Sequence, residues 1–281
     1  MTGRHPPWIR AAAPAPERTR RLDEVTRRRG LHTVCQSAHC PNLGDCWNRG
    51  TATFLLLGSR CTRGCRFCAV EAGQPMPADP AEPERVAQAV WELGLQHAVL
   101  TSVTRDDLPD GGAGQFAAAI QAIRRCQPGC TVEVLVPDFG GQREPLEQVL
   151  EAVPEVLGHN LETVARLYPR VRPGANYQRS LTLLGAAAGR RGGARVKSGL
   201  MVGLGERWEE VLAALSDLRE AGVDMLTVGQ YLSPSRRHLP VARYWRPREF
   251  AALAVRARAL GFAAVACGPL VRSSYHAEQM L

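Results

Sequence analysis

Six of the nine cysteines fall into two closely spaced triplets. One triplet has the pattern C-x3-C-x2-C within CTRGCRFC, with the aromatic Phe67 directly before its last cysteine; its members are Cys61, Cys65 and Cys68. The other lies in CQSAHCPNLGDC, at Cys35, Cys40 and Cys46. Thiolate sulfur is a favoured iron ligand, and a four-iron cluster takes four ligands. The triplets therefore predict two iron–sulfur clusters, each one protein ligand short, and an open iron is a place where another molecule can bind.

Two other uses of cysteine fit this spacing poorly. Zinc sites usually combine C-x2-C knuckles into a closed set of four ligands, and neither triplet has that form. Disulfide frameworks are typical of short secreted domains, whereas this chain has 281 residues, an odd number of cysteines and no segment that we interpret as a signal peptide.

Length and hydropathy predict a single-domain enzyme. A chain of 281 residues can bury a full core, and α/β barrels commonly have 200–250 residues in one domain. No apolar run reaches the roughly 18 residues that a membrane-spanning helix needs. We therefore expect a cytoplasmic protein that does not act at a membrane.

The formal net charge is +8, and much of the excess lies near the N-terminus, where residues 1–30 contain eight Arg and three Asp or Glu. One interpretation is a docking surface for an acidic partner, and the alternative is an ordinary solvated arm. Nucleic acid is less favoured, because no stacking aromatics or base-reading motif accompany the charge. Only one of the 35 basic residues is a lysine, Lys197.

Strand-like and helix-like segments alternate along the chain. The periodicity predicts helices around residues 208–218 and 250–260, with Gly94, Gly222 and Gly261 at helix ends. Repeated strand–helix units imply parallel strands joined by right-handed crossovers. We expect a partial (β/α)6-type TIM barrel, with a doubly wound open sheet as the alternative. The apolar runs predicted as buried strands are Phe54–Gly58, Ala98–Val103, Val132–Pro137, Glu155–Gly158, Val196–Val202, Met225–Gly229 and Ala263–Cys267.

Polar and glycine-rich segments follow each of these strands, which favours the barrel. In such barrels the active site lies at the carboxyl ends of the strands, in the loops that lead to the helices. The segments would therefore meet at one mouth. In chain order they are CTRGCRFC, TSVTRDDLPDGG, PDFGG, HNLET, GLGE, GQYLSPSRRHLP and CGPLVRSSYHA.

The C-x3-C-x2-C motif resembles the signature of radical S-adenosylmethionine (SAM) enzymes, and nearly the whole chain resembles the lipoyl synthase family. The N-terminal C-x4-C-x5-C together with RSSY near the other end is more specific than the central motif alone. The remaining motifs include PPWIR at 6–10, TSVTRDDLPDGG at 101–112, HNLETV at 159–164, VRPGANY at 171–177, KSGLMVGLGE at 197–206 and GQYLSPSRRHLPV at 229–241.

The resemblance implies a sulfurtransferase that inserts two sulfur atoms at carbons 6 and 8 of a protein-bound octanoyl-lysine, giving the lipoyl group. SAM would bind the cluster on Cys61, Cys65 and Cys68, and its reductive cleavage would give the radical that removes each hydrogen. A second 4Fe–4S cluster, on the N-terminal triplet, would donate the sulfur.

By the same resemblance, the fourth protein ligand of the second cluster is a serine of RSSY, carried over as Ser274 with Ser273 as the alternative. Oxygen matches iron less well than thiolate does, which suits a cluster that is dismantled. Cys267 is a competing ligand, but as an isolated cysteine that ends an apolar strand it is expected to be a buried small hydrophobe. Cys126 and Cys130 receive no chemical role.

Weaker candidates for contact with SAM or the substrate come from the strand ends: Phe67, Asn160, Glu162, Lys197, Gly203 and Gly205. Each has an alternative structural role, because polar groups at strand ends are often hydrogen-bonded core groups and GLGE could be a plain strand-to-helix turn. Asp106, Asp107 and Asp110 are expected to cap the helix that starts near Gly114 rather than bind a metal.

We expect three segments: residues 1–50 carrying the N-terminal triplet, residues 51–267 forming the barrel, and residues 268–281 forming a tail that closes its mouth. The implied partners are an octanoylated lipoyl carrier, such as a dehydrogenase lipoyl domain or the glycine-cleavage H protein, a reductant such as flavodoxin or ferredoxin, and an iron–sulfur carrier for cluster repair. The alternatives are another radical SAM sulfur-inserting or methylthiolating enzyme, or an iron–sulfur electron carrier without catalytic activity.

Overall fold

A computed structural model gives the structure of the protein. It describes residues 5–10, 16–38, 40, 42–43, 46, 52–190, 193–275 and 277–280. All nine cysteines and both serines of RSSY fall within these ranges, and no disulfide joins any of the cysteines.

Seven parallel strands form one curved sheet, and each corresponds to a predicted apolar run. They are β2 (Thr53–Leu56), β5 (His97–Ser102), β6 (Thr131–Leu135), β7 (Val156–Gly158), β8 (Arg195–Val202), β9 (Met225–Gln230) and β10 (Ala264–Gly268). A short strand, β1 (His32–Thr33), pairs antiparallel with β2 at one edge. A separate parallel pair, β3 (Arg60–Cys61) and β4 (Glu71–Ala72), lies in the loop after β2.

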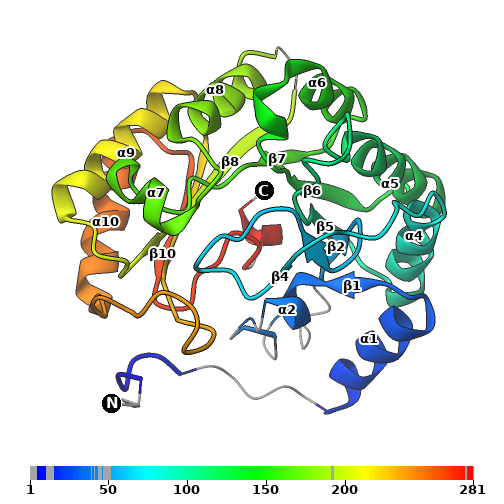
Figure 1. The fold of residues 1–281 in the computed structure, drawn as a ribbon, viewed down its shortest axis with the longest axis horizontal. Coiled ribbons are helices and arrows are strands. Elements are labelled where there is room, and N and C mark those ends of the chain that lie inside the picture. The colour runs from blue at the N-terminus through cyan, green and yellow to red at the C-terminus, as the bar shows by residue number, and fades with distance from the viewer. Residues whose placement is uncertain are drawn as a thin grey trace.

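The strand order distinguishes the barrel from the open sheet. The parallel strands neighbour one another in chain order from β2 to β10, whereas a doubly wound sheet would reverse direction at a switch point. Figure 1 shows the strands arranged as a ring with the long helices outside it. No hydrogen bonds between described residues join β10 to β1 or β2, so the barrel is partial, as predicted.

The helices complete six strand–helix units before β10, and the two helices predicted from periodicity are confirmed as α9 and α10. Gly94 ends α4, and its φ of 65° lies in the left-handed region. Glycine adopts this backbone conformation with less steric strain than other residues do. The helices are α1 (Pro16–Arg28), α2 (Val34–Ser37), α4 (Glu82–Leu93), α5 (Ala113–Cys126), α6 (Arg143–Glu151), α7 (Tyr168–Val171), α8 (Tyr177–Ala188), α9 (Trp208–Glu220) and α10 (Pro247–Ala259), with short 3-10 turns η1 (Phe139–Gly141), η2 (Ala165–Leu167) and η3 (Ala277–Gln279).

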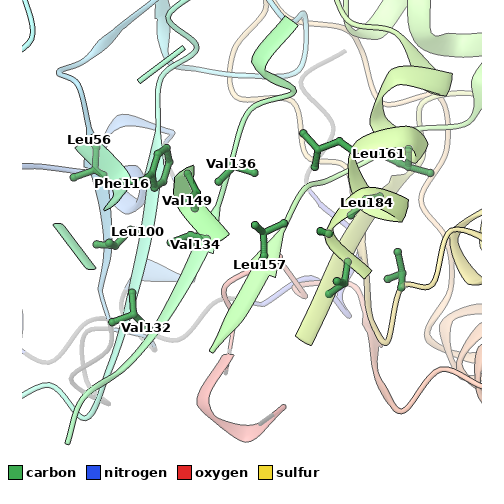
Figure 2. Close-up of a cluster of buried hydrophobic side chains, with 14 of the residues drawn as sticks. Leu56, Leu100, Phe116, Val132, Val134, Val136, Val149, Leu157, Leu161 and Leu184 are labelled. Atoms are coloured by element: carbon green, nitrogen blue, oxygen red, sulfur yellow. The ribbon is translucent and has the colours of Figure 1, made fainter. Parts of the chain in front are cut away.

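The main core lies between the outer face of the sheet and the surrounding helices. Figure 2 shows this layer, in which Leu100 and Val134 on the strands lie near Phe116 of α5 and Val149 of α6. All four side chains are buried. Side chains alternate between the two faces of a strand, so the strand residues next to Leu100 and Val134 point into the barrel.

The C-terminal tail begins at the barrel mouth and reaches the other end of the barrel. Ser273 bonds Asn160 just after β7, whereas Met280 packs against Val156 and Met225, which begin β7 and β9. The Arg195 guanidinium, at the start of β8, also donates to the Met280 carbonyl at 3.2 Å. Figure 1 shows the end of the chain inside the ring of strands. The tail therefore fills part of the barrel interior, and it contacts the mouth through Ser273.

The N-terminal helix α1 packs beside α4 on the outside of the barrel. Its arginines make part of this contact, because Arg28 and Arg29 both pair with Glu92 of α4. Among the described residues, no helix is long and apolar enough to cross a membrane.

Candidate active site at the barrel mouth

The central triplet lies in the loop between β2 and α4, on the carboxyl side of the sheet, where barrel active sites are built. Hydrogen bonds from three neighbouring loops fix its backbone. The Thr62 amide donates to the Thr104 carbonyl at 3.0 Å, and the Arg66 amide donates to the Val171 carbonyl at 2.9 Å. The ring of His238 lies 3.0 Å from the Cys68 carbonyl. The loops after β5, β7 and β9 therefore position this triplet.

An ion-pair network also supports the loop that carries the central triplet. The Arg63 guanidinium donates to Asp106 and to the fully buried Asp138 at 2.7 Å each. Although burial opposes ionisation, Arg63 holds the pKa of Asp138 down at about 2. The loop after β6 therefore joins the other three in holding the central triplet.

The sulfur atoms of the central triplet lie in a partly buried, hydrogen-bonded environment. Backbone amides of Arg63 and Thr104 donate to the Cys61 sulfur at 3.4 and 3.3 Å. Burial raises the pKa of Cys65 and raises that of Cys68 to about 12, and neighbouring cysteines add to both shifts. Such thiols lose their protons when a metal binds, and amide donors to sulfur are among the groups that tune iron–sulfur clusters.

The N-terminal triplet forms its own small apolar cluster. Cys35 and Cys46 are buried with Leu22 and Ala52, and Cys40 packs at the edge. Tyr275, from the other end of the chain, packs against this cluster. The side-chain amide of Asn42 also donates to the Leu270 carbonyl. The sequence-distant RSSY segment is therefore next to the N-terminal triplet.

A buried polar chain lies between the two triplets. At its centre, Asn160 Nδ2 donates to Glu162 Oε1 at 3.0 Å and to the Ser273 hydroxyl at 2.9 Å. Arg172 Nη1 donates to the Asn160 carbonyl at 2.9 Å. The guanidinium of Arg172 lowers the pKa of Cys65, opposing its burial. Polar groups thus extend from the central triplet to RSSY.

Glu162 occupies an unusual position in this chain. Its φ of 66° is a conformation that costs a non-glycine residue roughly 1–3 kcal/mol, and such strain clusters at functional sites. Two backbone hydrogen bonds to β8 hold it there, one from its amide to Gly199 and one from Met201 to its carbonyl. Burial raises the pKa of Glu162, while Arg172, Asn160 and Arg272 oppose that rise. The strained backbone therefore places a carboxylate between two arginines.

The two RSSY serines differ in their contacts. The Ser273 hydroxyl is held by Asn160, whereas the Ser274 hydroxyl makes no hydrogen bond within the described part of the chain. Cys267 lies beside Val228 on the helix-facing side of the sheet and packs against the main core. Burial raises the pKa of its thiol to about 12. The side chain packs on apolar residues as expected, but it is half-buried rather than fully buried.

Lys197 lies away from both triplets. Its Nζ is 2.9 and 3.0 Å from the two carboxylate oxygens of Glu133, inside the barrel, and its side chain is 1 % exposed. Lys197 is the third of eight residues in β8, and Glu133 is the middle residue of β6. His97 Nε2 lies 3.9 Å from the same carboxylate. The geometry makes Lys197 one half of a buried ion pair.

The GLGE segment forms a turn after β8 that the side chain of its own Glu206 holds. The Glu206 carboxylate accepts from the amides of Gly203 and Leu204 at 2.6 and 2.8 Å and from the Trp245 indole at 3.0 Å. A Cβ on Gly203 would lie 2.1 Å from Gln230 Nε2, so this position has room only for glycine. Gly203 and Gly205 both have φ of 107°.

The aspartates after β5 differ from the expected caps. Asp110 does accept from the amides of Gly112 and Gly114 at the start of α5, at 2.9 and 2.8 Å. The expectation was wrong for Asp106 and Asp107, which pair instead with Arg63 and Arg105. Each of these two carboxylates has an arginine close enough to form an ion pair, and it pairs with that arginine instead of capping the helix.

Other predicted residues occupy ordinary structural positions. Phe67 packs at the edge of the main core. Cys126 ends α5 and is exposed, and Cys130 is buried before β6. Arg172 and Arg272 were not predicted as site residues, although both lie in motifs of the sequence, VRPGANY and RSSY. The available signal was an arginine inside a motif in the segments that follow β7 and β10.

The donor set fits iron–sulfur clusters better than a single ion. Among the described residues, no three His, Cys, Asp or Glu side chains are arranged to hold one metal ion. A four-iron cluster has a different requirement, because each cysteine binds its own iron and the sulfurs need not converge. Two cysteine triplets with partly or fully buried thiols meet that requirement.

Comparisons with known proteins agree with this geometry. The family profile described as the Radical SAM superfamily matches residues 55–218. The chain is 55 % identical over 279 residues to the lipoyl synthase of Rubrobacter xylanophilus, covering 99 % of this chain and 87 % of that protein. It is 53 % identical over 278 residues to the lipoyl synthase of Caldanaerobacter subterraneus, covering 99 % and 97 %.

Solved structures show the fold alone at lower identity. Methylornithine synthase aligns with a TM-score of 0.55 at 15 % identity, over 90 % of this chain and 79 % of that one. A maturase of the FeFe-hydrogenase aligns with a TM-score of 0.56 at 15 % identity, over 75 % and 55 %. The fold, the superfamily match and the full-length relatives agree, and the chain belongs to the lipoyl synthase family of radical SAM enzymes.

Proposed function

We propose that this sulfurtransferase binds two 4Fe–4S clusters, one on Cys61, Cys65 and Cys68 with SAM at the open iron, and one on Cys35, Cys40 and Cys46 with Ser274 as fourth ligand. The observation that carries the proposal is the meeting of the N-terminal triplet with RSSY, through the packing of Tyr275 and the hydrogen bond from Asn42 to Leu270. Nothing in a SAM site alone requires the two ends of the chain to meet.

The substrate is an octanoyl group on a lysine of a lipoyl carrier, and two sulfur atoms enter at carbons 6 and 8. When bound, SAM and the clusters supply one-electron chemistry that breaks unactivated C–H bonds and the sulfur that replaces the hydrogen. The chain's own residues hold, orient and shield the reactants.

Asn160, Glu162 and Arg172 are the positioning residues of this proposal. They lie between the triplets, and Asn160 Oδ1 is buried without a hydrogen-bond partner among the described residues. An unsatisfied buried acceptor is costly, so a bound polar group that donates to it would be favoured. We assign this acceptor to SAM or to the amide of the acyl-lysine arm.

Lys197 and the GLGE turn receive supporting roles. Lys197 neutralises Glu133 inside the barrel, and Glu206 already occupies two backbone amides of the turn. Gly203 and Gly205 remain candidates for close backbone approach to SAM, and Phe67 for shielding the central loop. A cytoplasmic location, an iron–sulfur carrier for repair and a low-potential protein reductant complete the proposal.

One experiment tests the function directly. The reconstituted protein is reduced with dithionite and incubated with SAM and an octanoylated lipoyl domain, and the carrier mass is measured after one turnover. Gain of two sulfur atoms on the octanoyl chain is expected. A methylthio product would favour the alternative class of radical SAM enzyme, and an unchanged carrier with SAM cleaved would contradict sulfur insertion. An octanoylated lysine peptide serves as a control for carrier recognition.

A further inference from the structure

Four arginines surround the central cysteine loop without acidic partners. They are Arg66, Arg170, Arg236 and Arg237, all exposed, and we call them the loop arginine patch. None of them forms an ion pair, a side-chain hydrogen bond or an aromatic contact within the part of the chain that the structure describes. Many arginines elsewhere on the barrel do, including Arg85 with Asp79 and Arg124 with Glu155.

Backbone hydrogen bonds bring the patch together from three loops. The Arg66 amide donates to the carbonyl of Val171, the neighbour of Arg170, at 2.9 Å. The Arg66 carbonyl accepts from Leu239 at 3.1 Å, two residues after Arg237. The loop that carries Arg236 and Arg237 also reaches the Cys68 carbonyl through His238. The patch is therefore built around the segment that carries the central triplet.

We propose that the loop arginine patch is the docking surface for the acidic electron-donor protein that reduces the cluster on the central triplet. The inference rests on the proposed function. In each encounter the donor loses one electron and the cluster gains it, so the donor must dock once for every SAM cleaved. Arg66 lies between Cys65 and Phe67, so a protein in contact with it is within a residue of a cluster ligand.

The chemistry of the patch suits a transient redox partner. The positive charge of the patch attracts an acidic protein to the site, and this attraction weakens as the salt concentration rises. Electron-transfer encounters have small interfaces and lack the apolar centre of permanent ones. The exposed large hydrophobic side chains among the described residues, Met76, Trp91, Val153, Val255 and Leu260, all lie outside the three segments that form the patch.

The test combines a binding measurement with a rate. Arg170→Glu, Arg236→Glu and Arg237→Glu are combined, leaving Arg66 because it adjoins Cys65 and is two residues from Cys68. The matched control combines Arg248→Glu, Arg256→Glu and Arg258→Glu, exposed residues of α10, with the same change in net charge outside the patch. Affinity for oxidised flavodoxin is measured by calorimetry at low and high salt, and cluster reduction by flavodoxin hydroquinone is followed by stopped flow.

We expect the patch variant to lose at least about 10-fold in affinity and in the second-order reduction rate at low salt, while the control keeps parent values. Its reduction by dithionite and its KM for the octanoylated carrier under dithionite should not change. Equal flavodoxin affinity in the patch and control variants would overturn the proposal, as would a raised carrier KM under dithionite, which would assign the patch to the carrier. If the parent fails to insert sulfur with dithionite, the proposed function fails, while the flavodoxin affinities still report on the patch.

Discussion

The two cysteine triplets have the same number of thiols but are built in different ways. The central triplet is part of the barrel, and loops after four strands hold it through backbone hydrogen bonds and the Arg63 ion pairs. The N-terminal triplet lies in a small apolar cluster that joins α1, α2 and the tail near Tyr275. The sheet positions a site that lies on one barrel loop. A site made by two chain ends forms only when the whole fold has brought those ends together.

The largest difference between the two regions should appear when single cysteines are removed. Replacing Cys61, Cys65 or Cys68 by Ala is expected to abolish SAM cleavage and leave about half of the iron, because each cluster depends on its own ligands. Cys40→Ala should keep SAM cleavage and lose sulfur insertion. The measurements are 5′-deoxyadenosine, iron content and carrier mass, with exposed Cys126→Ala as the control. SAM cleavage by Cys65→Ala would show that the two regions are assigned incorrectly.

The next test concerns the meeting of the chain ends. Ser274→Ala should keep SAM cleavage but lower sulfur insertion by at least about 10-fold, because a ligand of the second cluster is lost. Ser274→Cys should retain iron and also insert sulfur poorly, since thiolate holds iron more firmly than oxygen does. Cys267→Ala is the control, because its side chain faces the helices. Ser273→Ala tests the alternative serine, whose hydroxyl is bonded to Asn160. Parent-like sulfur insertion by Ser274→Ala would exclude it as a ligand.

The barrel that supports the central region should depend on its interior ion pair. Lys197→Met leaves the Glu133 carboxylate buried and unpaired, which is expected to cost about 3–5 kcal/mol of unfolding free energy. Adding Glu133→Met should recover most of that loss. Urea unfolding of both variants measures the effect. A double variant that is stable but does not cleave SAM would instead place Lys197 in contact with a reactant.

A buried histidine makes the unfolding free energy of the barrel depend on pH. His159 bonds the Val136 carbonyl and the Ser180 hydroxyl, and burial lowers its pKa to about 4. The unfolded chain takes up this proton near its ordinary pKa of about 6.5, so the stability contributed is complete above that pH and is lost as pH falls towards 4.

From this shift, the unfolding free energy should fall by roughly 2 kcal/mol between pH 7 and pH 5 through His159. His159→Gln should show a correspondingly shallower decline, measured by urea unfolding at both pH values. A decline of the same steepness in parent and variant would exclude His159 as its source. Buried His97, whose pKa is also lowered to about 4, supplies an independent contribution that both proteins share.

The smallest effect is expected at α1. Neutralising Arg28 and Arg29 with Gln should lower stability by less than about 1 kcal/mol, because both pair with partly exposed Glu92, and the difference should shrink in high salt. Arg27→Gln, which removes no ion pair of the described residues, is the matched control. Melting temperatures check the effect. An increase in carrier KM for Arg27→Gln would instead support the docking role considered for this arm.

Much of the fold could be predicted because it rests on local patterns. Seven apolar runs gave the seven parallel strands, and helical periodicity gave α9 and α10. Buried parallel strands are continuous apolar segments, so they are easily found. The short β1 and the β3–β4 pair were not predicted, because two-residue strands have no periodicity and form only where a partner strand is available.

Cysteine spacing predicts six candidate ligand thiols, because this prediction depends on residue type and proximity in the chain. The surroundings of the candidate site could not be predicted in the same way. The roles of Asp106 and Lys197 depended on which charged side chains the fold placed nearby, Arg63 in one case and Glu133 in the other. Those partners are 43 and 64 residues away in the chain.

The sequence by itself determined the strand–helix order, the two thiol triplets and the family to which the chain is similar, because each depends on residues close together in the chain. Only the tertiary structure decided that RSSY lies against the N-terminal triplet, that Asn160 bonds the hydroxyl of Ser273 rather than that of Ser274, and that the loop arginine patch gathers around the central loop. These are contacts between distant segments. Their energies come from burial and charge pairing in three dimensions, which spacing along the chain does not specify.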